Sequence, residues 1–243
     1  MRIIFSLLFL SIITPSIAQE NKQSAFSFNY NYQIPNGTIA ERYGNSSAVG
    51  ISYFIEKENN IFYGISGDYI FGNNVNDSSI FINITTSTGS IISSDGNFAN
   101  VILQERGINS HLFVGYAFHT SDNNLSGIYL SAGLGYMQHK IFLSTKGQNI
   151  PQLNEEYKKG YDRSTSGIST KLAAEYKYYS KKGNMQFTGG LNFNLAYTSN
   201  DRPYNFDTKQ HTSAAKNTEQ KFGISIGMII PISRKNEEEF HYY

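Results

Sequence analysis

The sequence predicts an all-β fold, an eight-stranded antiparallel up-and-down transmembrane β-barrel. Three observations lead to this prediction. Apolar residues alternate with small or polar ones at period two over eight segments. Short and long connections alternate between these segments. The first 18 residues have the pattern of an export signal.

Composition excludes several classes of protein. The 243 residues include 20 Lys+Arg and 19 Asp+Glu, so the chain lacks the basic surface that a nucleic-acid partner requires. There is no Cys, which excludes disulfides, Cys-ligated metals and thiol catalysis. The five His residues have no metal-ligand spacing, so we expect neither a metal nor a cofactor.

The N-terminus is predicted to be a signal peptide over residues 1–18. Arg2 is followed by a run of mostly apolar residues and then by the small-residue site Ser16-Ile17-Ala18. The alternative is a buried N-terminal helix. Cleavage after Ala18 leaves a barrel domain over residues 19–233 and a short periplasmic tail over residues 234–243.

The first four strands follow from alternation in the first half of the chain. In the first of them, Phe26, Phe28 and Tyr30 share one face, while Ser27 and Asn29 share the other. The same pattern predicts strands over residues 26–34, 47–57, 61–71 and 107–118.

The second half of the chain repeats this scheme. Leu191, Phe193 and Leu195 alternate with Asn192 and Asn194, for example. The predicted strands cover residues 127–142, 166–180, 185–198 and 220–232. An even number of strands is typical of bacterial outer-membrane barrels.

The connections between the predicted strands alternate in length. Short ones lie near residues 57–60, 119–126 and 181–184, and long ones near 35–46, 72–106, 143–165 and 199–219. Outer-membrane barrels have short periplasmic turns and long external loops, so the four long connections are expected outside. Residues 80–84 and 98–103 predict a hairpin within the second loop. If residues 79–103 instead add a strand pair to the barrel, it has ten strands.

The direction of the apolar face separates a membrane barrel from a soluble barrel of lipocalin type. The second face is mostly Gly, Ser, Ala and Asn, which suit a narrow interior better than a hydrated surface. An apolar band in water would aggregate, whereas lipid requires one. Tyr is concentrated towards strand ends, as in an interfacial girdle. We therefore expect the cell outer membrane, with outer-membrane lipid as a partner.

Two short segments add a resemblance to these features. Residues 134–140 (LGYMQHK) and 157–163 (YKKGYDR), together with the signal peptide and the eight amphipathic strands, resemble the small outer-membrane β-barrel (porin-like) proteins of Bacteroidota. The resemblance implies the fold and the membrane, and no activity. One departure is the charged tail, because such barrels often end on an aromatic residue that closes the last strand.

Five polar residues are predicted to face the lumen of the barrel: Asp68, His111, Lys171, Glu175 and Lys177. Charges in a dry interior must be paired, and an eight-stranded barrel is too narrow for an open channel once side chains fill it. We interpret these residues as a buried polar network. The alternative is a narrow gated ion path lined by the same groups.

The third long loop supplies the candidate contact residues Tyr157, Tyr161, Asp162 and Arg163. Its charges are balanced, and its two tyrosines are of the type enriched in protein interfaces. Other envelope proteins are the partners that such a surface suggests. The alternative is an ordinary solvated loop.

The predicted function is that of a non-enzymatic structural or interaction protein with four long extracellular loops. The alternative is a small porin or gated channel for ions or small solutes. A membrane enzyme and a soluble lipid-binding barrel rank below both.

Candidate catalytic residues give little support for an enzyme. Ser110 and His111 are adjacent in a strand and point to opposite faces, so they cannot form a catalytic dyad. His119 and His211 each begin a His-x-Ser pattern, and both fall in predicted connections.

Overall fold

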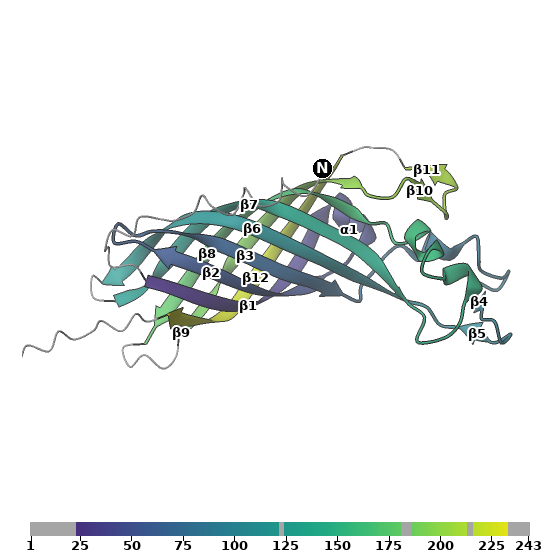
Figure 1. Cartoon of the computed structure of the whole chain (residues 1–243), viewed down its shortest axis with the longest axis horizontal. Coiled ribbons are helices and arrows are strands. Elements are labelled where there is room, and N and C mark those ends of the chain that lie inside the picture. Colours follow the sequence, from purple (N-terminus) through teal and green to yellow (C-terminus); the bar gives the residue numbers. More distant parts are fainter. Residues whose placement is uncertain (1–22, 122–123, 181–185, 213–215, 233–243) are drawn as a thin grey trace, which may run out of the picture.

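The computed structural model describes residues 23–121, 124–180, 186–212 and 216–232. Eight long strands form a closed barrel, and short elements gather beyond one of its ends (Figure 1). The barrel strands are β1 (Gln23–Gly37), β2 (Ser46–Glu56), β3 (Ile61–Gly72), β6 (Ile102–Ser121), β7 (Asn124–Ser144), β8 (Thr165–Tyr179), β9 (Gln186–Asn200) and β12 (Asn217–Ile232). Each pairs antiparallel with the next, and β1 closes the barrel against β12.

All eight predicted strands are confirmed, and several are longer than predicted. The main extensions are in β6 and β7, which reach into the second and third long loops. At the opposite end, β6 runs to Ser121 and β7 begins at Asn124, so the connection predicted over residues 119–126 is mostly strand. The predicted signal peptide, the charged tail and the turn at residues 181–184 lie outside the described residues.

The second long loop differs from its prediction. Residues 80–84 are not a strand, because Ile80 and Phe81 belong to the 3-10 helix η1 (Ser78–Phe81). A smaller hairpin forms between β4 (Ile91–Ile92) and β5 (Phe98–Ala99), outside the barrel wall. The described barrel therefore has eight strands, and the ten-strand alternative is wrong.

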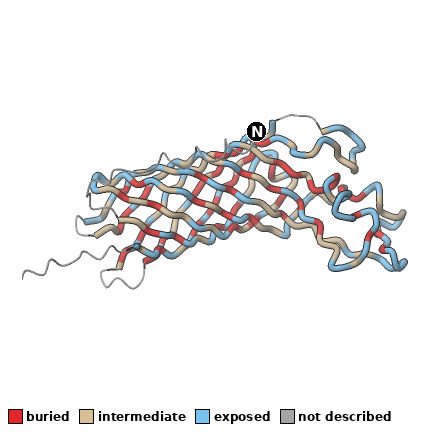
Figure 2. Tube along the Cα trace, viewed as in Figure 1, coloured by how far each residue is buried: buried red, intermediate tan, exposed pale blue. Residues whose placement is uncertain are grey.

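The two faces of the sheet differ as the alternation predicted. Buried and exposed residues alternate along the barrel strands (Figure 2). Large apolar side chains point outward, with exposed fractions of 66% for Leu112, 63% for Ile226 and 62% for Leu191. The inward face carries Ser, Asn, Gly and a set of charged residues. A closed barrel with an apolar outer surface suits lipid, where every backbone polar group must be paired within the protein.

The chain is thus an outer-membrane β-barrel, and its strands provide the membrane-spanning part. The short turn between β2 and β3 lies at one end of the barrel, and the elements of the long loops lie at the other (Figure 1). In the part of the chain that the structure describes, no helix combines the length and the apolar character needed to cross a bilayer.

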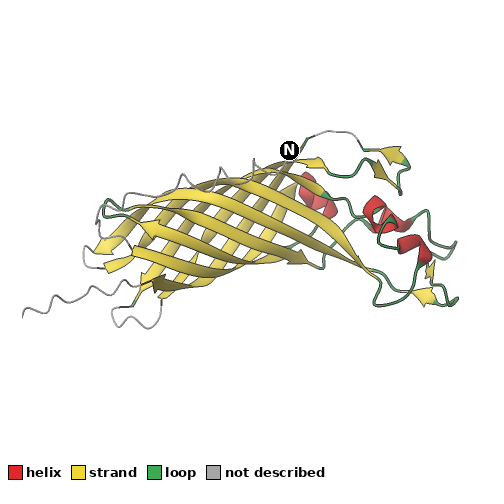
Figure 3. Ribbon diagram, viewed as in Figure 1, coloured by secondary structure: helices red, strands yellow, loops and turns green. Residues whose placement is uncertain are grey.

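The elements of the long loops gather beyond one end of the barrel, and we call them the cap (Figure 3). Besides η1, β4 and β5, the cap contains α1 (Thr38–Arg42), η2 (Pro151–Leu153), η3 (Tyr157–Gly160), β10 (Tyr204–Asn205) and β11 (Gln210–His211). The cap has its own apolar core, formed by Ile39, Tyr43, Ile80, Phe81, Ile91, Ile141, Leu143, Ile150, Leu153 and Tyr161. The loops are therefore packed against one another by buried side chains.

Candidate functional site

An ammonium group enclosed by aromatic rings lies in the lumen near the short-turn end. The Lys177 Nζ is 3.6 Å from the ring centroid of Phe54, 4.3 Å from that of Tyr129 and 4.9 Å from that of Phe62. All four side chains are buried. Cation–π attraction compensates the loss of hydration of such an ammonium group. The rings and the lysine together fill this level of the barrel.

A carboxylate–imidazole pair lies beside these rings. The Glu56 Oε1 is 2.6 Å from the His119 Nε2, and the Tyr129 hydroxyl donates a hydrogen bond of 2.9 Å to the Glu56 Oε2. His119 lies in β6 and pairs with Glu56, so its predicted place in a connection is wrong. The reason is that β6 and β7 continue almost to their turn, as the register of Ser121 with Asn124 shows.

A small polar cavity occupies the middle of the lumen. It has a volume of about 50 Å³, and its walls include His111, Lys171, Glu175 and Lys177. Lys171 also binds Asp68, with 3.2 Å between Nζ and Oδ2. Four of the five predicted lumen residues thus line this cavity, and the fifth, Asp68, is paired with one of them. The cavity has room for about three water molecules.

A layer of amides and hydroxyls lies next to the cavity. Ser169 Oγ lies 3.0 Å from the His111 Nε2 and donates a hydrogen bond of 3.1 Å to the Asn109 Oδ1. Asn192 donates to Asn31 at 3.2 Å. Such groups are costly to bury unless paired, and here they satisfy one another across strands that are distant in sequence.

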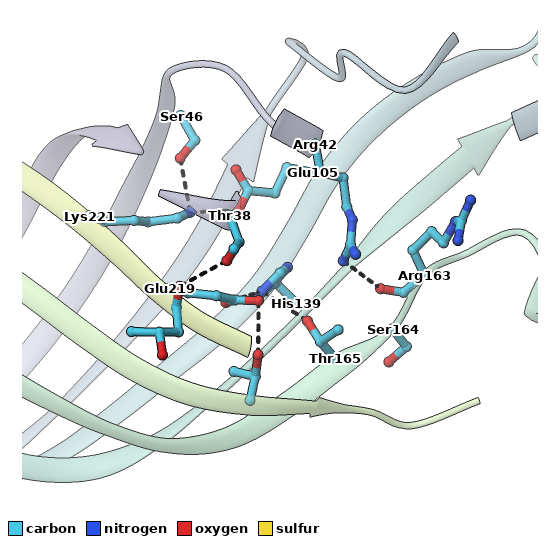
Figure 4. A network of polar contacts seen from close by, with 12 residues as sticks. Thr38, Arg42, Ser46, Glu105, His139, Arg163, Ser164, Thr165, Glu219 and Lys221 are labelled. Atoms are coloured by element: carbon cyan, nitrogen blue, oxygen red, sulfur yellow. Dashed lines mark hydrogen bonds and ion pairs between the residues drawn. The ribbon is translucent and has the colours of Figure 1, made fainter. Parts of the chain in front are cut away.

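The mouth of the barrel, below the loop cap, contains a buried ion pair (Figure 4). The Lys221 Nζ is 2.6 Å from the Glu105 Oε1, and it also donates to Ser46 at 3.3 Å and to Gln33 at 3.4 Å. These residues come from β12, β6, β2 and β1. The pair therefore connects strands on different sides of the lumen.

A second pair lies at the same end (Figure 4). The His139 Nε2 is 2.6 Å from the Glu219 Oε2, and Thr198 donates to the other oxygen of Glu219 at 2.9 Å. The Tyr43 and His139 rings pack edge to face, with 5.3 Å between centroids. Burial raises the pKa of the Tyr43 hydroxyl above its usual range, so this side chain stays neutral beside His139.

Ion pairs also hold the loop cap together. Arg202 binds Asp162 through two hydrogen bonds of 3.0 and 2.5 Å, and these bonds raise the pKa of Arg202. Arg163 contacts Asp207 and lies 3.6 Å from Asp77. Bidentate pairs of arginine and carboxylate, such as Arg202–Asp162, are among the stronger polar contacts in proteins. They connect the second, third and fourth long loops.

Asp201 is a further link within the cap. Its carboxylate accepts hydrogen bonds from Ser164 at 2.7 Å, from Gln138 at 3.2 Å and from Ser166. Burial alone would raise the pKa of Asp201, but these hydrogen bonds and the Arg202 charge together lower it. The ionised form therefore holds the end of β9 against β7 and β8.

An aromatic cleft opens between three of the loops. It has a volume of about 430 Å³ and is lined by Ile84, Pro151, Gln152, Tyr157, Tyr161 and Phe206. The Phe206 ring lies 5.4 Å from that of Tyr161 and 6.0 Å from that of Tyr157. Gly160 is required here, because a Cβ at this position would collide with the Phe206 ring. The size of the cleft falls within the range of small-ligand sites.

The structure separates the four loop residues that the sequence grouped as a contact surface. Tyr157 is 51% exposed and forms a wall of the cleft. Tyr161 and Asp162 are each 5% exposed, and Arg163 is turned towards Asp207. Three of the four expected contact residues therefore lie inside the cap, because they satisfy its core and its ion pairs.

Several lumen residues were missed from the sequence: Glu56, Glu105, His119, Tyr129, His139, Glu219 and Lys221. In each strand they occupy the same alternating positions as the residues expected on the inward face. Glu105, His119 and Glu219 lie just beyond the predicted strand ends, so extending the alternation by one step would have found them; the other four lie within the predicted strands. Among the described residues, no group of three or more His, Asp or Glu side chains could hold a metal ion.

The comparisons with known proteins concern architecture. No family model and no curated protein matches the chain. Among solved structures, it is similar to Neisserial surface protein A, with 10% identity, a TM-score of 0.42 and coverage of 84% of this chain and 96% of that one. The attachment invasion locus protein of Yersinia pestis has 9% identity and a TM-score of 0.40, and the match covers 86% of this chain and 98% of that one. A major outer membrane protein from Thermus thermophilus has 9% identity and a TM-score of 0.43, and the match covers 86% of this chain and 99% of that one.

Proposed function

We propose that this protein is a non-enzymatic interaction protein of the outer membrane, whose packed loops present a recognition surface at the cell exterior. The observation that carries the proposal is the aromatic cleft, which lies in a cap held rigid by its own core and ion pairs. A partner that binds a rigid surface does not have to order it, which favours affinity. Other envelope proteins or an extracellular partner are candidate occupants.

The filled lumen supports this proposal over an open porin. Side chains occupy the lumen at the level of Lys177, at the Asp68–Lys171 pair and at the mouth. The resemblance to the porin-like barrels of Bacteroidota is kept as a proposal of kinship, supported by residues 134–140 and 157–163 of the sequence. Outer-membrane lipid is the surrounding partner that the apolar face requires.

Photocrosslinking in intact cells tests the interaction. A photoreactive residue replaces Tyr157 at the cleft or Thr208 on an exposed turn of the same cap. The proposal predicts a discrete adduct from position 157 that position 208 does not give. The same adduct should be lost when Phe206→Ala removes a wall of the cleft. Equal labelling from both positions, or no discrete adduct, would contradict the proposal.

A second candidate, a small gated channel, is favoured by one observation. Charged groups and a polar cavity succeed one another along the barrel axis. Conduction would require the mouth to open and Lys177 to move away from its rings. Stepwise conductance of the wild-type protein in planar bilayers would favour this candidate. The interaction proposal predicts none for the wild type.

A further inference from the structure

Two cations lie directly opposite each other on the outer surface of the barrel, near the loop end. Arg106 on β6 and Lys140 on β7 are cross-strand partners. Both point outward, because the residues next to them in sequence, Glu105 and His139, are buried in the lumen. Like charges at opposed positions of neighbouring strands repel each other. The pair therefore lowers the stability of the sheet unless an anion lies against it.

The two cations mark a change in the character of the outer surface. Towards the short-turn end, Ile108 and Tyr136 begin the exposed apolar band of β6 and β7. Successive outward residues are about 7 Å apart along a strand, so Arg106 lies one such step beyond Ile108 and Lys140 two steps beyond Tyr136. In membrane barrels an aromatic girdle marks the level of the lipid headgroups. The cations therefore lie at the outer membrane boundary.

Arg106 is held in place by its surroundings. Its guanidinium donates to the Glu105 carbonyl at 2.8 Å and to the Gln104 side chain at 2.7 Å, and it lies 5.9 Å from the Phe142 ring centroid. Within the described ranges, neither Arg106 nor Lys140 forms an ion pair with a carboxylate. An oriented guanidinium and an opposed ammonium, both facing lipid, are suited to an oxyanion.

The nearby carboxylates have other partners. Glu155 forms an ion pair of 2.7 Å with Lys158, and the pKa of Glu155 is lowered by Lys158 first and by the charge of Lys140 second. Asp201 is bound by serine hydroxyls and by Gln138. These acids reduce the positive potential without pairing with the two cations.

We propose that Arg106 and Lys140 bind the phosphate of an anionic lipid headgroup in the outer leaflet around the barrel. The phosphate removes the repulsion between the two cations and receives hydrogen bonds from both. The lipid chains would then lie along the apolar band below. The site is separate from the aromatic cleft and goes beyond the interaction proposed for the loops.

The test uses the purified full barrel in nanodiscs of phosphatidylcholine, with or without phosphatidylglycerol. Phosphatidylglycerol should raise the unfolding temperature of the wild type, and native mass spectrometry should detect it on the released protein. The double variant Arg106→Gln/Lys140→Gln should retain about 25-fold less of this lipid, because each cation near an anionic surface contributes about fivefold. In phosphatidylcholine alone the variant should fold at least as well as the wild type, since a repulsion is removed.

The matched control is Lys216→Gln. Lys216 is an exposed cation next to β12, across the barrel from β6 and β7. Its removal should leave lipid retention unchanged. Equal retention by the double variant and the wild type would overturn the proposal, as would an equal loss in Lys216→Gln. A stabilisation by inorganic phosphate equal to that by phosphatidylglycerol, and dependent on both residues, would overturn the assignment to lipid.

Discussion

At the residue scale, the lumen depends on small residues opposite charged ones. Gly50 on β2 is the cross-strand partner of Asp68 on β3, and a Cβ at Gly50 would collide with the Asp68 carboxylate. We predict that Gly50→Ala displaces Asp68 from Lys171 and lowers the free energy of unfolding by about 1–3 kcal/mol. Urea titration of the barrel in lipid vesicles measures this difference.

Gly67, which directly precedes Asp68 on β3, provides a control for Gly50→Ala. A Cβ there would meet no atom within 4 Å, because Gly67 lies on the outward face of β3. Gly67→Ala should change the free energy of unfolding by less than about 0.5 kcal/mol. Similar effects of the two substitutions would mean that the loss comes from the glycine backbone and not from the position of Asp68.

The Lys221–Glu105 pair gives a second prediction at this scale. Both side chains are almost fully buried, so Lys221→Met leaves an uncompensated carboxylate and should cost about 3–5 kcal/mol of stability. The double variant Lys221→Met/Glu105→Gln should recover part of this loss. A double-mutant cycle from urea titrations measures the coupling. Strictly additive single effects would contradict a direct pair.

At the scale of elements, the cap is held by contacts between loops. Arg202→Ala removes both hydrogen bonds to Asp162 and should loosen the fourth long loop. We predict faster chymotrypsin cleavage after Tyr204 and Phe206, whose rings are packed in the cap of the wild type. Lys209→Ala, at an exposed position of the same loop, should cleave at the wild-type rate. Equal acceleration in both variants would contradict this role of Arg202.

The same loop should respond to acid through Asp201. Its pKa is lowered in the folded protein, so its contribution is present above the unfolded pKa of about 3.9 and is lost as the pH falls through the folded value. Hydrogen exchange of the Asp201 amide, which donates to the Ser164 carbonyl at 2.9 Å, measures this effect. Protection should fall below about pH 4, and this acid-dependent loss should disappear in Asp201→Asn. Constant protection of the Asp201 amide in the wild type down to pH 2 would contradict this role of the Asp201 carboxylate.

The strands were predictable from the sequence, and the loops were not. Alternation at period two identifies a strand and its faces locally, which is why Leu191 and Asn192 were assigned to the correct sides. The sequence predicts a strand at Ile80, as part of a hairpin, yet packing in the cap core holds this residue in a 3-10 helix. Ion pairs such as Lys221–Glu105 depend on barrel closure, and alternation carries no information on that.

At the scale of the whole molecule, the barrel separates two surfaces with different partners. The outer face is apolar and contacts lipid. The polar groups of the inner face form hydrogen bonds and ion pairs with one another. The cap then closes one end with a core of its own. This division explains how a chain without cysteine can hold long loops in an ordered arrangement at one end of the barrel.

The direction of the apolar face is tested most directly by spin labels. The chain contains no native Cys, so Leu112→Cys, Leu191→Cys and Ile226→Cys each give one labelled site on the outer face, and Thr208→Cys gives a site in the cap. In bilayers the three outer labels should collide with oxygen, which is enriched among acyl chains, and be shielded from a water-soluble nickel chelate. The cap label should show the reverse. Free access of the chelate to the three outer labels would contradict the membrane barrel.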